Sequence, residues 1–319
     1  MRSAGLHWCC SRLNADHGRL APDGRIFLMV VYSGSREIPL TAHQYGRECA
    51  LSVSFERAAD FYDETRGYPP DVQERIGKAL LDVASATHKS RILEMGVGTG
   101  RIALPIIRAG YHYTGVDISP RMLEKLRAAL RAIPGAEQRV TLVEGDITAL
   151  PFADRSFDVV LTVHVLHLVA DCARAIGEGM RVLARPGVAL NGRDDHADDT
   201  VGRDIGAAWH DILHSLGWHA HSDPPWRAAA PTSPLDEWQR LGGEVDTFVA
   251  VEWETRRTPA LDIEQLAQRV WSRTWSVPDH IYPEAIRRLR AWAEHQYGDA
   301  LDKPLPRRQR FIIERARFS

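Results

Sequence analysis

The chain has 319 residues, which is enough for one large α/β domain or for a core domain with a substantial additional lobe. Its 40 basic and 42 acidic side chains give a formal net charge of -2, so no overall field would attract nucleic acid or an anionic membrane. We therefore expect a small-molecule substrate, no nucleic-acid partner and no membrane association.

The N-terminal region carries few interpretable signals. Its one concentrated apolar run, Ile26–Tyr32, is too short to span a bilayer and follows charged residues and turn formers rather than the start of a signal peptide. We expect residues 1–50 to form an extension that packs poorly. The chain has four cysteines, Cys9, Cys10, Cys49 and Cys172, which show neither the C-x-x-C spacing of a zinc site nor a disulfide framework. We therefore expect no metal site and a protein of the reducing cytoplasm.

The first clear helical pattern lies between residues 70 and 86. Ile76, Leu80 and Val83 recur at the spacing of one helix face, so we expect an amphipathic helix over Pro70–Ala86 that covers the first strand of a sheet.

A glycine-rich stretch follows, Arg91–Ile102, with the sequence RILEMGVGTGRI. Its apolar start predicts the end of a buried strand, and Gly96, Gly98 and Gly100 allow the backbone to turn sharply into a helix. Such a turn leaves backbone N–H groups facing a pocket where a polar ligand can approach the main chain.

The spacing of the glycines separates three classes of ligand. A dinucleotide fingerprint requires a third glycine at position 101, which is Arg101, and this opposes a nicotinamide enzyme. A phosphate-binding P-loop requires a Gly-Lys-Ser/Thr sequence that is absent here. The remaining pattern is E-x-G-x-G-x-G, from Glu94 to Gly100.

Three further short strands are predicted downstream, at Tyr111–Val116, Val140–Val143 and Phe157–Thr162. Asp117 follows the first of them, about twenty residues after the first glycine, where a carboxylate can accept both ribose hydroxyls. The alternative role for Asp117 is the N-cap of the helix predicted at residues 119–132, although Ser119 can also cap that helix.

These motifs, in this order, resemble the class I S-adenosylmethionine (SAM) dependent methyltransferases, and most closely the type 11, UbiE-like subgroup that acts on small molecules. The resemblance covers roughly residues 55–192 and starts near Ser54, which leaves the first fifty residues outside it. Val188 departs from the pattern, because the family usually has a second glycine there. The elements that carry the resemblance are Glu94–Gly100, Asp117, Glu144–Ile147, Phe157–Thr162 and the segment from Glu178 to Gly187.

The resemblance implies a Rossmann-like three-layer α/β sandwich with a seven-stranded, mostly parallel sheet whose last strand is antiparallel. It divides the chain into an extension at residues 1–50, a SAM-binding core at 54–192 and a C-terminal part at 193–319 that contains a helical substrate lid. It also implies SAM as cofactor and S-adenosylhomocysteine as product, bound by Tyr62, Arg66, Glu94, Gly96, Gly98, Gly100, Asp117, Ile118, Asp146, Ile147 and His164.

Individual roles follow from the same resemblance. Asp146 accepts a hydrogen bond from the adenine amine and Ile147 packs on the ring. Tyr62 and Arg66 contact the methionine end of SAM, whose carboxylate suits a phenol or guanidinium; the alternative is a surface Arg66 paired with a neighbouring acid. His164 faces the sulfonium and the substrate.

His164 and His167 are the candidate catalytic residues, because both follow the fourth strand at the carboxyl edge of the sheet. Each is a possible general base, and for His167 a structural hydrogen bond is an equal alternative. The chain lacks the Pro-Pro-aromatic motif of enzymes that methylate nucleic-acid amines, and Cys172 lies inside the next helix, which opposes pyrimidine methylation.

The C-terminal part is expected to begin with a solvated, acidic loop, Asn191–Thr200, in which no spacing fixes metal ligands. One helix face follows at residues 201–216, then a proline-rich linker at 223–234. Strands six and seven are expected at residues 244–254 and 310–316, with helices at 262–272 and 283–297 between them.

Eight of the nine tryptophans fall in this last part, which suggests a lid over an apolar, aromatic-binding pocket, with ordinary packing as the alternative. We expect SN2 methyl transfer from SAM to O, N or C of a small, apolar or aromatic molecule, by a monomer or homodimer. The alternative is a SAM-binding protein without methyl transfer that docks proteins on its tryptophan-rich lobe.

Overall fold

The computed structural model describes residues 66–319 except 170, 197–198, 219–233 and 272–273. The predicted extension, Tyr62 and most of the proline-rich linker lie outside the described residues. No helix among the described residues is long and apolar enough to cross a membrane.

The described chain contains one seven-stranded sheet in the order β3-β2-β1-β4-β5-β7-β6. Five neighbouring strands are parallel, and β7 runs antiparallel to both β5 and β6, as expected from the sequence. The strands are β1 Ile92–Met95, β2 Tyr113–Asp117, β3 Val140–Glu144, β4 Phe157–Val163, β5 Leu183–Asp195, β6 Glu244–Arg257 and β7 Leu305–Phe318.

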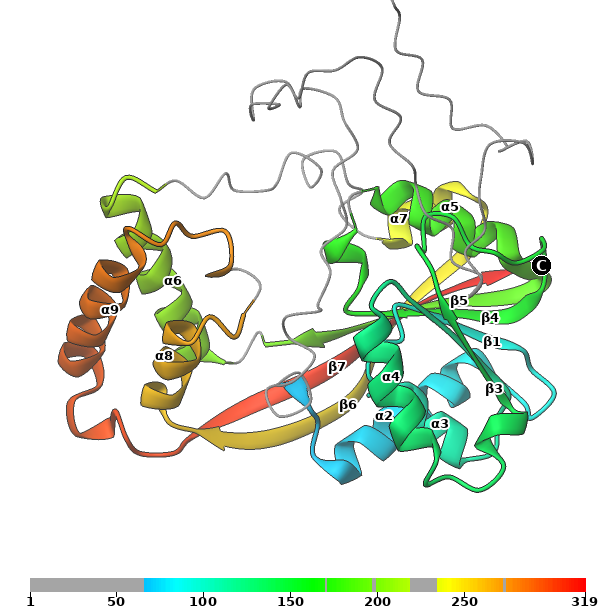
Figure 1. Ribbon diagram of the computed structural model, residues 1–319, viewed down its shortest axis with the longest axis horizontal. Coiled ribbons are helices and arrows are strands. Elements are labelled where there is room, and N and C mark those ends of the chain that lie inside the picture. Colours follow the sequence, from blue (N-terminus) through cyan, green and yellow to red (C-terminus); the bar gives the residue numbers. More distant parts are fainter. Residues whose placement is uncertain (1–65, 170, 197–198, 219–233, 272–273) are drawn as a thin grey trace, which may run out of the picture. The chain divides into compact units, whose positions relative to one another are not determined.

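Helices cover both faces of this sheet (Figure 1). On one face lie α2 Pro70–Ala84, α3 Ala103–Arg108 and α4 Pro120–Leu130, and on the other α5 Cys172–Val182 and α7 Pro234–Arg240. Buried side chains alternate between the two layers, since Ile92 of β1 belongs to the core under α2 while Leu93 belongs to the core under α5. Since both faces of the sheet are covered, the central strands β1 and β4 are mostly apolar and buried along almost their whole length.

Three helices, α6 Thr200–Ser215, α8 Pro259–Ala267 and α9 Tyr282–Tyr297, form a lobe with its own core. Trp209 and Leu213 of α6 pack there against Leu266 of α8 and Leu289 of α9. Because α8 follows the end of β6 and α9 precedes β7, the paired β6–β7 ribbon leads into this lobe.

The structure corrects the predicted loop at residues 191–200. Residues 191–195 continue β5 and pair with β7, where Asn191 donates to Glu314 over 2.8 Å and Arg193 donates to Glu314 over 3.0 Å. Asp195 lies 3.9 Å from Arg310 of β7, so this acidic segment is part of the sheet instead of a solvated loop. Asp199 then caps α6 by accepting the Gly202 N–H over 2.9 Å.

Other element boundaries differ by a few residues, and α7 was not predicted. The helix predicted at 262–272 begins earlier, because Pro259 occupies its first turn and the Thr258 hydroxyl accepts the Leu261 N–H over 3.1 Å. Strands β6 and β7 extend beyond the predicted ranges because they pair with each other along their full lengths, to Arg257 opposite Leu305.

Candidate active site

The glycine turn links β1 to α3. Gly96, Gly98 and Gly100 all have positive φ, at 81°, 54° and 88°, a region that suits glycine. A Cβ on Gly96 would lie 2.4 Å from a methyl carbon of Val165, whereas a Cβ on Gly98 would meet nothing within 4 Å. The main chain of Gly98 is therefore open to a ligand, while Gly96 is packed against the segment after β4.

Asp117 at the end of β2 closes this turn. Its carboxylate accepts the Gly98 N–H over 2.8 Å and the Ser119 N–H over 2.9 Å. Ser119, not Asp117, caps α4, because its hydroxyl accepts the Met122 N–H over 3.2 Å. The next side chain, Ile118, is 44% exposed although it is large and apolar, and so can cover a planar ligand.

The end of β3 lies beside Asp117, since the Gly145 N–H donates to the Asp117 carbonyl over 3.0 Å. Asp146 follows with an exposed side chain that accepts the Thr148 N–H over 2.8 Å. Ile147 is 7% exposed and belongs to the core under α5. The structure thus brings Asp117, Ile118 and Asp146 to one edge of the sheet.

Glu94 lies behind the turn rather than at an open surface. It is 2% exposed, and the Tyr113 hydroxyl donates to its Oε2 over 2.8 Å. Burial raises the pKa of Glu94 to about 8, against the opposing effects of Tyr113 and the Arg101 charge. Glu94 is therefore largely protonated at neutral pH and acts as an internal hydrogen-bonding group beneath the glycines.

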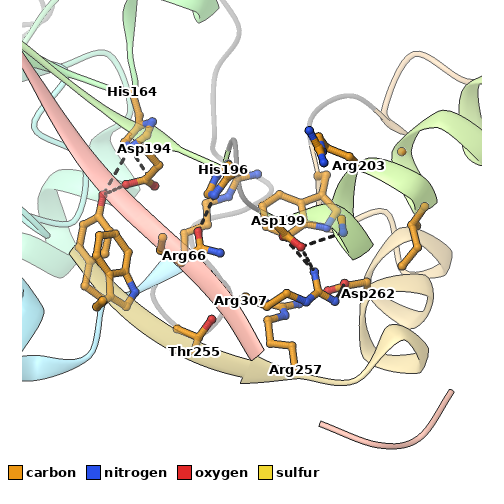
Figure 2. Close-up of a pocket in the computed structure, with 18 of the residues that line it drawn as sticks. Arg66, His164, Asp194, His196, Asp199, Arg203, Thr255, Arg257, Asp262 and Arg307 are labelled. Atoms are coloured by element: carbon orange, nitrogen blue, oxygen red, sulfur yellow. Dashed lines mark hydrogen bonds and ion pairs between the residues drawn. The ribbon is translucent and has the colours of Figure 1, made fainter. Parts of the chain in front are cut away.

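A pocket of about 640 Å³ lies next to the turn. It includes Arg101, the residue after Gly100, and His164, the residue before Val165, which contacts Gly96. Figure 2 shows the side chains that surround it, from β5, β6, β7, α6 and α8. Of the predicted site residues, Arg66, His164 and His167 line this pocket.

His164 is held by two partners in the pocket wall. Its Nε2 lies 3.1 Å from Asp194 Oδ2 and 3.4 Å from the Tyr68 hydroxyl, which itself donates to Asp194 Oδ1 over 2.8 Å. His164 also has a φ of 52°, which is uncommon outside glycine and accompanies its position at the end of β4. Figure 2 shows His164 and Asp194 close to each other near β7.

The ionisation of this pair is set by burial and by neighbouring charge. Burial has the largest effect on the pKa of His164 and lowers it, Asp194 raises it, and the charges of Arg101 and His196 lower it, so the pKa lies below its usual value and the neutral ring predominates at pH 7. Burial opposes ionisation of Asp194, but His164, Arg101 and Tyr68 outweigh it and hold the Asp194 pKa below its usual value. An ionised Asp194 accepts the Nε2–H of His164, which leaves a lone pair on Nδ1.

The pocket wall combines apolar surface with many charged side chains, which were not expected from the sequence. Among the described tryptophans, Trp253 and Trp271 line the pocket. Five arginines, three aspartates and three histidines also line it: Arg66, Arg101, Arg203, Arg257, Arg307, Asp194, Asp199, Asp262, His164, His167 and His196. Most other described tryptophans serve packing, as Trp209 and Trp238 do in two separate cores.

Arg307 of β7 pairs with two aspartates at the start of helices α6 and α8 of the lobe. Its side chain is 3% exposed, donates to both carboxylate oxygens of Asp199 over 2.8 and 2.9 Å, and donates to Asp262 over 2.6 Å. Arg257 of β6 donates to the other oxygen of Asp262 over 2.8 Å. These pairs join α6 and α8 to the two strands (Figure 2).

Sequence reasoning missed Tyr68 and Asp194 and used Arg101 only to exclude a dinucleotide site. The acidic run at 191–200 was the available signal for Asp194, but its strand pairing was not evident. Among the described residues, no cluster of three or more His, Cys, Asp or Glu side chains could hold a metal ion. His167 is exposed at the pocket rim.

The chain is similar in sequence to several known proteins. Residues 93–190 match the model of a family described as a methyltransferase domain. The uncharacterized methyltransferase Rv3342 of Mycobacterium tuberculosis is 31% identical over 249 residues, which cover 75% of this chain and 85% of the relative. Demethylmenaquinone methyltransferase of Tropheryma whipplei is 35% identical over 150 residues, 46% of this chain and 59% of the relative.

Among solved structures, the YcgJ protein from Bacillus subtilis superposes with a TM-score of 0.48 at 17% identity, covering 76% of this chain and 98% of that one. The CcbJ methyltransferase from Streptomyces caelestis superposes with a TM-score of 0.38 at 28% identity, covering 43% and 55%. The extent of the match to the mycobacterial relative, with the matched domain, confirms the family predicted from the motifs: the chain belongs to the SAM-dependent methyltransferases.

Proposed function

We propose that the glycine turn binds the adenosine part of SAM and that the adjoining 640 Å³ pocket binds the molecule that receives the methyl group. The observation that carries this proposal is the shared wall between the two sites. Arg101 continues directly from the turn and His164 adjoins the residue that packs on Gly96, and both line the pocket. A cofactor held at the turn would therefore have its reactive end beside the pocket.

The residues at the turn fit SAM. The open main chain at Gly98 gives room for a ligand, and a carboxylate such as that of Asp117, which the two backbone N–H groups hold in place, can accept ribose hydroxyls. Exposed Ile118 would cover one face of the adenine, and Asp146 would accept its amine. Ile147 would support the ring from the core, and buried Glu94 would support the turn from below.

The methionine end of SAM is assigned to Arg66. This arginine lines the pocket, its guanidinium lies 5.0 Å from the Trp271 ring, and it donates to the Val270 carbonyl over 3.4 Å. A guanidinium in this position suits a carboxylate. Tyr62, the other residue assigned to this end, lies outside the described residues.

His164 is the residue we assign to proton removal. When bound, SAM supplies a methyl group already activated by its sulfonium, so the protein has to position the acceptor, exclude water and take a proton from an O–H or N–H group. Neutral His164, with Nε2 turned to Asp194, can accept that proton on Nδ1. Asp194 and Tyr68 hold the ring and stabilise its charged form. His167 at the rim is the alternative base.

The docking alternative is less well supported. It requires an exposed apolar patch on the lobe, whereas the exposed large apolar side chains among the described residues come from three different elements: Ile118, Val249 and Leu261. The lobe borders a cavity whose wall includes charged side chains of α6 and α8.

Calorimetric titration with SAM tests the cofactor assignment. Asp117→Ala should weaken binding by at least about 100-fold, because two hydrogen bonds to a charged group are lost. Asp171→Ala is the matched control, since Asp171 also accepts a backbone N–H, from Arg174 over 2.9 Å, but it caps α5. Unchanged affinity in Asp117→Ala, with the control behaving like the native protein, would remove the ribose assignment.

A further inference from the structure

Arg101 lies at the boundary between the glycine turn and the pocket. It is the residue after Gly100, and its half-buried side chain lines the pocket. Its main chain is fixed by α2, because the Gln73 side-chain amide donates to the Arg101 carbonyl over 2.7 Å. The guanidinium therefore extends into the pocket wall from an anchored part of the turn.

The side chain of Arg101 binds the segment that precedes α2. Its Nη1 donates to the Arg66 carbonyl, and its guanidinium carbon lies 4.6 Å from the centroid of the Tyr68 ring. A planar guanidinium can lie over an aromatic face while its N–H groups bind an oxygen. Arg101 thus holds both the main chain of this segment and the Tyr68 ring.

Tyr68 in turn contacts the proposed base and its partner. Its hydroxyl donates to Asp194 Oδ1 over 2.8 Å and lies 3.4 Å from His164 Nε2. Trp253 and Phe311 meet its ring edge to face, with centroids 5.7 and 6.1 Å away. The position of the hydroxyl depends on how these side chains and the guanidinium hold the ring.

The charge of Arg101 acts on the same pair. Burial has the largest effect on both groups: it raises the pKa of Asp194 and lowers the pKa of His164. The Arg101 charge lowers the pKa of both, while His196 lowers that of His164 and the Tyr68 hydroxyl lowers that of Asp194. A positive charge at this position therefore favours an ionised Asp194 beside a neutral His164, the combination that a general base requires.

We propose that Arg101 is a positioning residue for methyl transfer, which holds Tyr68 against Asp194 and so fixes His164 beside the cofactor turn. This inference rests on the proposed function, in which His164 takes a proton from the acceptor. It joins the two sites physically, because the residue that continues from the glycine turn also orders the groups around the base.

Nuclear magnetic resonance of the ligand-free protein, labelled with ¹³C-histidine, tests the effect on the base. The His164 signal is the one missing from His164→Gln. Arg101→Met removes the charge and the hydrogen bond, so the protonated fraction of His164 at pH 6 should rise at least about twofold. Arg101→Gln, which also lacks the charge, should give the same rise and replaces Arg101→Met if that variant does not fold. Arg101→Lys keeps the charge and should stay within about 1.5-fold of the native fraction.

The position of Tyr68 is followed separately by ¹⁹F resonance in protein labelled with 3-fluorotyrosine. The Tyr68 signal is assigned with Tyr68→Phe and should move in Arg101→Met, because the ring loses the guanidinium over its face. Arg108→Met is the matched control for both measurements. Arg108 of α3 also binds α2, through Glu74 over 2.8 Å, but it does not line the pocket, so neither signal should change.

Three results would each overturn the proposal: a native protonated fraction of His164 in Arg101→Met, an unmoved Tyr68 resonance in that variant, or an Arg101→Lys variant that changes the fraction as much as Arg101→Met does. Failure of the native protein to bind S-adenosylhomocysteine in a calorimetric titration would instead overturn the proposed function. The resonance measurements need no ligand and would still report on Arg101.

Discussion

The glycine turn and the arginine-lined pocket adjoin each other but are built in different ways. The turn depends on backbone conformation and on contacts between residues close in sequence, such as Gly98 and Asp117, 19 residues apart. The pocket depends on side chains brought together from afar, since Tyr68 and Asp194 are 126 residues apart and Asp199 and Arg307 are 108 apart. A site of the first kind tolerates little change in the main chain, whereas a site of the second kind can change its ligand by a few substitutions.

The largest effect should come from breaking the pocket's buried ion pairs. Arg307→Met leaves Asp199 buried without its cation and Asp262 with Arg257 alone, so the free energy of unfolding should fall by about 3–5 kcal/mol. Denaturant titration measures this. If the two regions are built independently, the glycine turn keeps its structure in those molecules of the variant that are folded. Their affinity for SAM should then change by less than about threefold.

Arg308→Met is the control for this experiment, because Arg308 is the next residue of β7 and its side chain is exposed. It should change stability by less than about 0.5 kcal/mol. Equal losses in the two variants would mean that the network around Arg307 contributes no more than an ordinary surface charge.

A matched pair of glycine substitutions tests the other region. Gly96→Ala combines a φ of 81° with a contact of 2.4 Å to Val165, and should cost about 3 kcal/mol. Gly98→Ala has a φ of 54° but open space around the new methyl, and should cost about 1 kcal/mol. Thermal unfolding without ligand measures both, and a larger loss in Gly98→Ala would contradict the geometry of the turn.

These differences also explain what the sequence could predict. The glycine spacing and the apolar runs gave β1, the turn and the strand order through a family resemblance, because that information is local. Residues 191–195 form a strand because they pair with β7, more than a hundred residues later in the chain. The acidic run by itself predicts a loop. The tryptophans suggested an apolar pocket, and Trp253 and Trp271 do line it, but arginines from α6, β6 and β7 line it too, and no sequence period brings those residues together.

A third prediction concerns the buried acid beneath the turn. Because burial raises the Glu94 pKa to about 8 from an ordinary value of 4.5, the folded state holds a proton that the unfolded chain releases. This contribution is full below pH 4.5 and is lost as pH rises through 8. Glu94→Gln keeps an acceptor for Tyr113 but cannot ionise, so its stability relative to the native protein should rise by about 3 kcal/mol between pH 5 and pH 8. A constant difference between the two proteins across this range, measured by urea titration, would contradict the assignment.

The smallest expected effect concerns Asp194, which acts through His164 as a positioning residue. Asp194→Asn removes the charge that raises the His164 pKa, so the pKa should fall further below its usual value and the acidic limb of the kcat profile should move to lower pH. The weaker support for the protonated ring should lower kcat by about tenfold, while KM for SAM stays within about twofold. Asp195→Asn, on the next residue of β5 and near Arg310, is the control and should leave the limb in place. A loss of kcat in Asp194→Asn with an unmoved acidic limb would mean that Asp194 serves only to pack the pocket wall, and His167 would then become the better candidate for the base.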